Sequence, residues 1–348
     1  MPVYRLAFLG DGVVARALRS LLVTRRAALA QEYGIEFLVA GVATRTLGWR
    51  ANAQGLQGDA DVRLAPDCGG IKAWLKTCQA DVLFEAIALD PHEGQPALGY
   101  IRYALEQGVH VVSANKGPVV HGYRTLTELA RRHGKIYRFE SAVMDGAPVF
   151  SLVREFLPQA GLRGVRGIFT STATIALESM ERGSTLAEGI VHAQQLGIAE
   201  ADPSYDIDGW DSVVKVCALA NVLLDGDLRP QHVARTGLRV LDAEEVRAAH
   251  ASGSPYRLVG EVSRDRAGAL NAEVRPRRCQ PGDPLFGATG TTLITHFEAE
   301  VFPGGLTVTS RDPDTTTTAY GMLADFIDIA RLSIRGLRLR AADTSAEN

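Results

Sequence analysis

Short apolar segments alternate with amphipathic helical segments over the first 145 residues of the chain. The first helical segment, for example, repeats its apolar residues every three or four positions, at Val14, Leu18, Leu21 and Leu22. Apolar strands that are each followed by such a helix are typical of parallel βαβ units, whose sheet is covered on both faces. The pattern predicts an α/β fold that begins with a doubly wound Rossmann domain, with strands at 4–9, 35–42, 81–88, 109–113 and 135–140 and helices at 11–22, 70–77, 94–107 and 122–133.

The pattern changes after residue 145. Alternating apolar and polar residues, typical of half-buried strands, occur at 163–171, 260–263, 271–275, 291–300 and 306–309, and helical segments at 149–157, 186–196 and 209–224. We therefore predict that residues 1–145 form the Rossmann domain and that residues 146–318 form an α+β domain with a mostly antiparallel sheet. An amphipathic helix at 319–331 is expected to pack back on the first domain, before a frayed end at 339–348.

The composition is that of a globular protein of about two domains, at ~150 residues per domain. Of the 348 residues 46% are hydrophobic and 22% charged, and the net charge is −3, which excludes wholesale disorder and gives a nucleic-acid partner no support. No apolar run approaches the ~20 residues that span a bilayer, and no signal peptide is recognisable. The four cysteines are scattered. We expect a soluble, cytoplasmic protein with no nucleic-acid or membrane partner.

A loop with two glycines follows the first predicted strand and opens the first helix. It reads Gly10-Asp-Gly-Val-Val-Ala15. The first glycine permits a tight turn, the second lets the backbone approach a pyrophosphate, and the small alanine allows close contact of helix and sheet. The N–H groups at a helix N-terminus favour the negative charge of a pyrophosphate. We therefore predict a dinucleotide site formed by Gly10, Asp11, Gly12, Val13 and Val14.

The end of the second predicted strand indicates which dinucleotide is preferred. A carboxylate there would bind the 2′-hydroxyl of the NAD ribose, whereas an arginine accommodates the 2′-phosphate of NADP. The chain has Ala-Thr-Arg45-Thr at this point and no carboxylate. Arg45 as an ordinary solvated loop residue is the simpler alternative. We predict NADP as the preferred cofactor over NAD, with Arg45 as a cofactor-binding residue.

Charged residues gather before and within a predicted helix of the second domain. Asp208 stands where an N-cap is expected, and Asp211 and Lys215 are four residues apart, so both project from one face of the helix. A surface ion pair beside a capping acid would explain this spacing as well. Two further acids on a proline-containing loop, Glu200 and Asp206, favour a functional site.

Three segments resemble a known family. EAIALDPHEGQPAL at 85–98 leads through a helix to VVSANKGPVV at 111–120, and LGIAEADPSYDIDGWDSVVK at 196–215 is one long signature. Together they resemble the homoserine dehydrogenases, and the resemblance runs from Tyr4 to Arg331. The family interconverts L-homoserine and L-aspartate 4-semialdehyde with NAD(P), in threonine and methionine biosynthesis. Because the chain ends soon after its last predicted helix, the resemblance is to a short form without a regulatory domain, which implies no inhibition by threonine.

The resemblance implies roles for the charged residues. Glu200 and Asp211 would bind the substrate, whose ammonium needs carboxylates, while Asp206 supports the site. Lys215 would be the catalytic acid–base. Since the reference pKa of lysine is ~10.4, burial or a cationic neighbour must lower the pKa of a lysine that acts as a base at neutral pH.

Lys116 could be that cationic neighbour. It follows the fourth predicted strand, at the edge where doubly wound sheets bind ligands. A Lys-Gly-Pro loop that is only a polar connection is the alternative. The resemblance places Lys116 beside the nicotinamide and the substrate, as a further catalytic and cofactor-binding residue, with Ser113 and Asn115 near the cofactor.

The resemblance also implies that residues 146–318 form the catalytic, substrate-binding and dimerisation domain of a homodimer. It further implies a monovalent cation, Na⁺ or K⁺, held mainly by backbone carbonyls. Such hard, weakly bound ions take oxygen ligands. The cation would lie at Glu140, Val143, Asp145 and Ala147. The eight histidines form no cluster with cysteines, so a transition-metal site is not expected.

The chain departs from the family at three places. Thr170–Thr174 reads TSTAT and lacks the two asparagines that are usual there. SRDPD at 310–314 replaces a glycine-rich loop near the cofactor, and Ile87 replaces a hydroxyl residue near the nicotinamide. These differences leave two alternatives to homoserine dehydrogenase activity: a same-fold dehydrogenase of a related amino or hydroxy acid, and a non-catalytic NADP-binding homologue.

Overall fold

The structure is a computed structural model that describes residues 3–346, with side chains described to residue 333. The chain divides into two compact units. The first comprises the residues up to Pro118, Gly122–Gly146 and the residues from Thr315 on, and the second comprises Val119–His121 and Ala147–Asp314.

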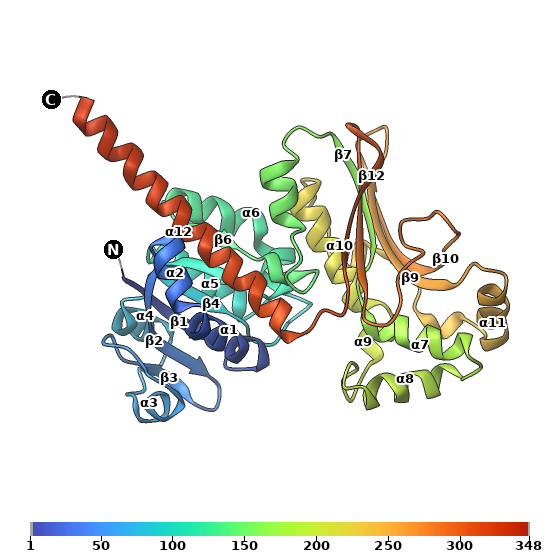
Figure 1. Ribbon diagram of the computed structural model, residues 1–348, viewed down its shortest axis with the longest axis horizontal. Coiled ribbons are helices and arrows are strands. Elements are labelled where there is room, and N and C mark those ends of the chain that lie inside the picture. The colour runs from blue at the N-terminus through green and yellow to red at the C-terminus, as the bar shows by residue number, and fades with distance from the viewer. Residues whose placement is uncertain (1–2, 347–348) are drawn as a thin grey trace. The chain divides into compact units, whose positions relative to one another are not determined.

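The first unit contains a six-stranded sheet in the order β3-β2-β1-β4-β5-β6. All neighbours are parallel except β3, which pairs antiparallel with β2 at the edge. The strands are β1 (Val3–Leu9), β2 (Glu36–Thr44), β3 (Gly48–Ala51), β4 (Val82–Glu85), β5 (His110–Ser113) and β6 (Tyr137–Arg138). This arrangement confirms the predicted Rossmann sheet (Figure 1).

Helices accompany this sheet along the chain: α1 (Val13–Thr24), α2 (Arg26–Tyr33), α3 (Asp59–Leu64), α4 (Ile71–Cys78), α5 (Ala97–Glu106) and α6 (Lys116–Arg132). The apolar pattern did not predict α2, α3 or the edge strand β3. Helix α2 has few buried residues, and α3 and β3 are short, so none of them carries a strong periodic pattern.

Helix α12 (Thr315–Ala346) returns to the first unit and packs against α1 (Figure 1). Phe326 is fully buried, with its ring centroid 5.7 Å from that of Phe84 in the sheet. Burial of one such side chain contributes roughly 1.5–3 kcal/mol. The helix is longer than the predicted 319–331 and continues through most of the segment predicted to fray, while residues 347–348 lie outside the described residues.

The second unit contains a six-stranded sheet in the order β12-β11-β7-β9-β10-β8. Its strands are β7 (Leu162–Ile168), β8 (Ala234–Arg235), β9 (Tyr256–Arg264), β10 (Leu270–Arg278), β11 (Leu293–Ala299) and β12 (Phe302–Ser310). Every pairing is antiparallel except the short one between β10 and β8. The predicted α+β architecture is confirmed.

The helices of this unit are α7 (Ser171–Glu181), α8 (Leu186–Gln195), α9 (Ser204–Ile207), α10 (Trp210–Leu223) and α11 (Ala243–Ala251). A short π-helical turn, Leu152–Phe156, lies in the segment predicted as helix at 149–157. Helices α7 and α10 both contact β9. The sequence predicted a strand through residue 171, but β7 ends at Ile168 and α7 begins at Ser171, because small and hydroxyl residues with no alternation follow the strand.

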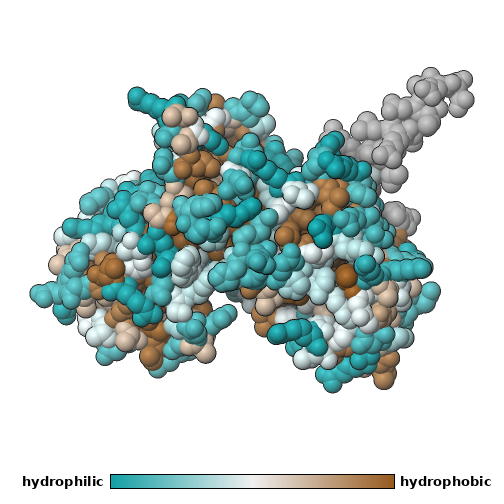
Figure 2. All heavy atoms as spheres, turned by 180° about the vertical axis from the view of Figure 1, so that it is seen from behind, coloured by the Kyte–Doolittle hydropathy of each residue, from teal (hydrophilic) through white to brown (hydrophobic). Residues whose placement is uncertain are grey.

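Apolar side chains on the face drawn in Figure 2 form separate patches among hydrophilic ones. The large apolar residues are instead concentrated in the two units' interiors, and Trp74, Phe8, Phe169 and Phe297 are among those with almost no exposed surface. Within the described part of the chain, no helix combines the length and the apolarity needed to cross a membrane.

Candidate active site

The glycine loop forms the turn between β1 and α1. Gly10 has φ +107°, and a Cβ atom there would lie 2.5 Å from the carbonyl oxygen of Ala86, so only glycine fits. Gly12 is the N-cap of α1, and a Cβ atom at this position would have open space for 4 Å around it. Among the described residues no side chain caps this helix, so its first N–H groups are left for a ligand.

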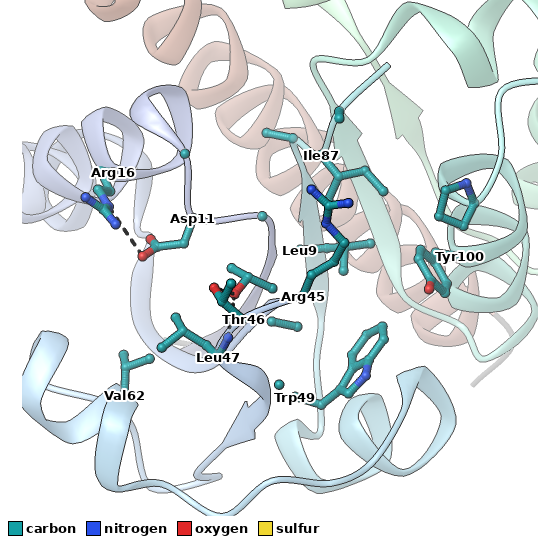
Figure 3. A pocket seen from close by; sticks show the side chains of 18 of the residues that line it. Leu9, Asp11, Arg16, Arg45, Thr46, Leu47, Trp49, Val62, Ile87 and Tyr100 are labelled. Carbon is teal, nitrogen blue, oxygen red and sulfur yellow. Dashed lines mark hydrogen bonds and ion pairs between the residues drawn. The ribbon is translucent and has the colours of Figure 1, made fainter. Parts of the chain in front are cut away.

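A pocket of about 800 Å³ opens beside this loop, at the carboxyl ends of β1, β2 and β4 (Figure 3). Its lining includes the loop residues Gly10, Asp11 and Gly12. Of the other two predicted loop residues, Val13 is exposed at the first position of α1 and Val14 packs against the core. The tight turn, the uncapped helix N-terminus and the pocket's size fit a dinucleotide whose pyrophosphate lies on the loop.

Arginines and aromatic rings form the wall of the pocket beyond the glycine loop. Arg45 follows β2 and extends between Ile87 and Trp49 in Figure 3. Arg45 has no ion pair among the residues that the structure describes, and its side chain is exposed. The rings of Trp49 and Tyr100 lie edge to face, with centroids 5.5 Å apart. This wall offers a cation for a phosphate and apolar rings for a base.

Carboxylates also reach this pocket. Asp11 accepts hydrogen bonds from Arg16 at 3.3 Å and from Arg19 at 2.6 Å, and Arg19 lies 3.3 Å from the carboxylate of Asp59. Asp59, at the first position of α3, lines the pocket but has a largely exposed side chain. It stands fifteen positions from the end of β2 in a helix that the sequence pattern did not predict, so sequence reasoning missed it.

Ser113 and Asn115 lie in a buried network at the carboxyl ends of β4 and β5. The Ser113 hydroxyl donates to Oε2 of Glu85 at 2.5 Å, and Nδ2 of Asn115 donates to Oε1 of Glu85 at 3.2 Å. Glu85 itself has no exposed surface, and burial raises the pKa of its carboxyl. Sequence reasoning assigned no role to Glu85. The one signal in the sequence was the position of a charged residue at the end of an apolar strand.

Lys116 is the first residue of helix α6, which corrects the prediction of a loop that becomes helical at residue 122. Asn115 is the N-cap, and its Oδ1 accepts a hydrogen bond from the N–H of Gly117 at 3.0 Å. This cap satisfies an N-terminal donor and lets the helix begin six residues earlier, through the Gly-Pro pair. The Lys116 side chain is half-buried at the helix N-terminus.

In the second unit, Lys215 and Asp211 form an ion pair in the first turns of α10. Nζ of Lys215 lies 2.9 Å from Oδ2 of Asp211 and donates to the carbonyl oxygen of Phe169 at 2.5 Å. The two side chains are only 10% and 13% exposed. The pair is therefore largely withdrawn from solvent, which excludes the alternative of an ordinary surface ion pair.

Asp206 belongs to the same charge cluster. Burial and the negative charge of Asp211 raise the pKa of Asp206, while Thr172 and Thr170, through side-chain hydrogen bonds, and the charge of Lys215 act in the opposite direction. Thr170 and Thr172 lie in the segment that lacks the family's asparagines, and both are buried. Their hydroxyls give this segment a polar contact with the predicted site.

The prediction that Asp208 is the N-cap of α10 is wrong. Asp208 ends α9, and Gly209, with φ +85°, is the residue that precedes α10. Oδ1 of Asp208 instead accepts a hydrogen bond from Arg239 at 2.7 Å. Residues 204–207 form one helical turn, which the pattern was too short to predict. Glu200 lies exposed between α8 and α9, where its backbone oxygen accepts from Gln194 at 3.0 Å, and its substrate role stays a prediction.

Three of the four residues of the predicted cation site, Glu140, Val143 and Asp145, lie at the end of the first unit's middle segment. The backbone N–H of Glu140 donates to Asp325 at 2.8 Å, Val143 is buried, and Asp145 has φ +48°. Ala147 is the first residue of the second unit's long segment, Ala147–Asp314. No group of three or more His, Cys, Asp or Glu side chains in the described residues is arranged as a metal site. A backbone-bound cation and the approach of Lys116 to Lys215 both stay predictions.

A family model, relatives and solved structures agree on one family for this chain. The sequence model of "Homoserine dehydrogenase" matches residues 148–327. The chain is 34% identical over 347 residues to the "NAD(+)-dependent homoserine dehydrogenase" of Pseudomonas canavaninivorans, covering 96% of this chain and 98% of that protein. It is 28% identical to the homoserine dehydrogenase of Methanocaldococcus jannaschii, with 92% and 96% covered.

A solved structure agrees with these relatives. The crystal structure of a protein assigned as a homoserine dehydrogenase from Archaeoglobus fulgidus superposes with a TM-score of 0.82, at 29% identity, covering 95% of this chain and 99% of the other. At this coverage the match extends over both units. The chain belongs to the homoserine dehydrogenase family.

Proposed function

We propose that this protein interconverts L-homoserine and L-aspartate 4-semialdehyde with a nicotinamide dinucleotide, as a step of threonine and methionine biosynthesis. The observation that carries the proposal is the buried ion pair of Lys215 and Asp211, at 2.9 Å, inside the signature segment 196–215. A lysine beside carboxylates suits a substrate that carries both a hydroxyl and an ammonium group.

Lys215 is the acid–base in this proposal. In the oxidation, the C4–H bond breaks as hydride and the O–H bond as a proton, so that an aldehyde forms. When bound in the first unit's pocket, the nicotinamide supplies the hydride acceptor. Lys215 takes the hydroxyl proton at Nζ and returns it to solvent, and in the reduction it donates the proton to the aldehyde oxygen. The carbonyl of Phe169 and the carboxylate of Asp211 hold Nζ in place between turnovers.

The acids around Lys215 bind the substrate ammonium. Asp211 and Asp206 belong to one charge cluster, and Glu200 is on the loop that leads to it. Removal of water from carboxylates strengthens their attraction for an ammonium ion. Lys116, at the N-terminus of α6, completes the catalytic set as the second cation.

Arg45 supports a preference for NADP over NAD. It follows β2, lines the pocket and has no ion pair within the described residues, so its guanidinium is available for a 2′-phosphate. The alternative is NAD, favoured by Asp59 in the same pocket and by the NAD(+)-dependence named for the P. canavaninivorans relative. Asp59 is ion-paired with Arg19, which reduces its availability for a ribose hydroxyl.

The second candidate function is a dehydrogenase of a related amino or hydroxy acid. It is favoured by the Thr170–Thr174 segment, where threonine hydroxyls contact Asp206 in place of the family's amides.

The test is an assay of the purified protein with L-homoserine and each of NAD⁺ and NADP⁺, followed by a panel of hydroxy amino acids. We expect homoserine to give the highest kcat/KM, with NADP⁺ as the better acceptor. A higher kcat/KM with NAD⁺ would make NAD the cofactor, and turnover of another panel member alone would support the second candidate. Tight NADPH binding without turnover of any substrate would contradict both enzymatic proposals.

A further inference from the structure

A buried carboxylate stands directly behind the cofactor pocket. Glu85 is the last residue of β4, between β1 and β5, and has 0% exposed surface. No lysine or arginine pairs with it within the part of the chain that the structure describes. An unpaired carboxyl in the interior is costly and needs hydrogen-bond donors to be tolerated.

Three donors serve the two oxygens of Glu85. Oε1 accepts from the N–H of Ile87 at 3.0 Å and from Nδ2 of Asn115 at 3.2 Å. Oε2 accepts from the hydroxyl of Ser113 at 2.5 Å. These bonds favour the ionised carboxyl and oppose the effect of burial on its pKa.

Each donor belongs to an element that the reaction uses. Ile87 and its neighbours Ala86 and Ala88 form the pocket wall after β4. Asn115 caps α6 by accepting from Gly117 at 3.0 Å, and its Nδ2 also donates to the carbonyl of Ile87 at 3.4 Å. The cap directly precedes Lys116. A single carboxylate therefore joins the pocket wall to the helix start that carries the lysine.

We propose that Glu85 is a positioning residue, whose carboxylate fixes the Ala86–Ala88 wall and the start of α6 so that the cofactor and Lys116 take their working places. The proposal rests on the proposed function for the role of Lys116, but its effect on the pocket is independent of the substrate. Without the carboxylate, the Ile87 N–H and the Asn115 amide lose a buried acceptor, and the wall is free to move away from the position that receives the cofactor.

The variants are Glu85→Met and Glu85→Gln. Methionine is similar in length but accepts no strong hydrogen bond, whereas glutamine keeps one oxygen for Ile87 and Asn115 and turns an amide toward Ser113. The matched control is Asp81→Asn, at the other end of β4. Asp81 accepts from the N–H of Arg5 at 2.8 Å and lies outside the pocket and the catalytic set.

NADPH and NADH are the probes, and their Kd values are measured by nucleotide fluorescence without substrate. We expect Glu85→Met to raise both values by roughly tenfold, the ratio for a donor that loses its acceptor, and to lower kcat as well. Hydrogen exchange at the N–H groups of Ile87 and Gly117 should become faster in the same variant. Glu85→Gln should restore most of the affinity, and Asp81→Asn should lower the melting temperature while leaving Kd and kcat unchanged.

Unchanged Kd values in folded Glu85→Met, or an equal loss of affinity in Asp81→Asn, would overturn the proposal. If Glu85→Met does not fold, Ser113→Ala removes one donor only, and faster exchange at Ile87 with a higher Kd for NADPH is expected there. If the wild-type protein fails to oxidise homoserine, the proposed function falls, while the NADPH measurements still decide the role of Glu85.

Discussion

Individual residues set the chemistry of this protein through burial and spacing. Four positions along α10 bring the ammonium of Lys215 to the carboxylate of Asp211, and the fold then withdraws the pair from solvent. An exposed pair at this spacing would contribute only about 0.3–0.5 kcal/mol to stability. Arg45 and Asp206 follow the same principle, because the fold places Arg45 in the pocket lining and Asp206 in the charge cluster of Lys215 and Asp211.

Lys215→Met should lower kcat and kcat/KM together by ~10²–10⁴-fold, the usual range for loss of a positioned acid–base, with NADPH affinity nearly unchanged. Methionine keeps the apolar stem but has no proton to transfer. The control is Lys76→Met on α4, an exposed lysine far along the chain from the site, which should leave turnover unaltered. A near-normal kcat in a folded Lys215→Met protein would show that Lys215 is not the catalytic acid–base.

Arg45→Asp should weaken NADPH binding more than NADH binding. The substitution removes a guanidinium and sets a carboxylate against the 2′-phosphate, an effect typically worth ~1.5–3 kcal/mol, so the ratio of the two affinities should shift by roughly ten- to a hundredfold. Arg25→Asp makes the same charge change on the surface and serves as the control. A ratio that does not change would show that Arg45 is a surface loop residue.

Asp206→Asn should raise stability and weaken homoserine binding. Because burial and Asp211 raise the pKa of Asp206, ionisation of this carboxyl destabilises the folded state, and that loss grows as pH rises from the unfolded-state pKa of 3.8 through the folded value. At pH 7 the variant should therefore melt at a higher temperature than the wild-type protein. Below pH 3.8 the gain should vanish.

Thermal unfolding at both pH values and the KM for homoserine check this prediction. A gain of equal size at acidic and neutral pH would show that the charge of Asp206 is not its source.

Among the elements, the turn from β1 to α1 tolerates few backbone and side-chain changes at Gly10. Gly10 adopts a positive φ against the Ala86 carbonyl, whereas Gly12 has φ −75° and open space in front of it. The two glycines therefore have different functions: Gly10 allows the turn to form, and Gly12 leaves room for a ligand.

Substitution of each glycine by alanine tests these two functions separately. Gly10→Ala should destabilise the protein by about 1–3 kcal/mol, since it combines backbone strain with a contact of 2.5 Å. Gly12→Ala should leave the melting temperature nearly unchanged, yet raise the Kd for NADPH because its methyl group occupies part of the pocket. Melting curves and nucleotide titrations distinguish the two variants. Tight NADPH binding by Gly12→Ala would show that the pyrophosphate does not lie on this loop.

At the scale of the whole molecule, we expect a homodimer formed through the second unit's sheet. Strand β12 is an edge strand, and Val301 and Phe302 at its start are exposed, which leaves backbone and apolar groups for a partner copy. Light scattering at micromolar concentration should give twice the chain mass of 37.4 kDa. A mass of one chain at that concentration would contradict the prediction. If the dimer forms, Phe302→Lys should shift the equilibrium from the dimer toward the monomer.

The sequence alone determined the larger features of this protein, because they follow from local rules. Periods of two and of three to four residues predicted both sheets, and the Gly10–Ala15 loop predicted the dinucleotide turn, since strand, turn and helix N-terminus are adjacent in the chain. The spacing of Asp211 and Lys215 likewise placed both on one face of α10. Short elements such as α9 and β3 escaped prediction because they have too few residues to show a period.

Only the tertiary structure decided which polar residues work together. Glu85, Ser113 and Asn115 come from two strand ends about thirty positions apart, and parallel pairing of β4 with β5 brings them into hydrogen-bond contact. Because Asn115 caps α6, the helix begins at Lys116 and not at residue 122, where the sequence pattern predicted its start. Burial decided that Lys215 and Asp211 form an interior pair, because exposure depends on what the rest of the chain covers and not on the residues themselves.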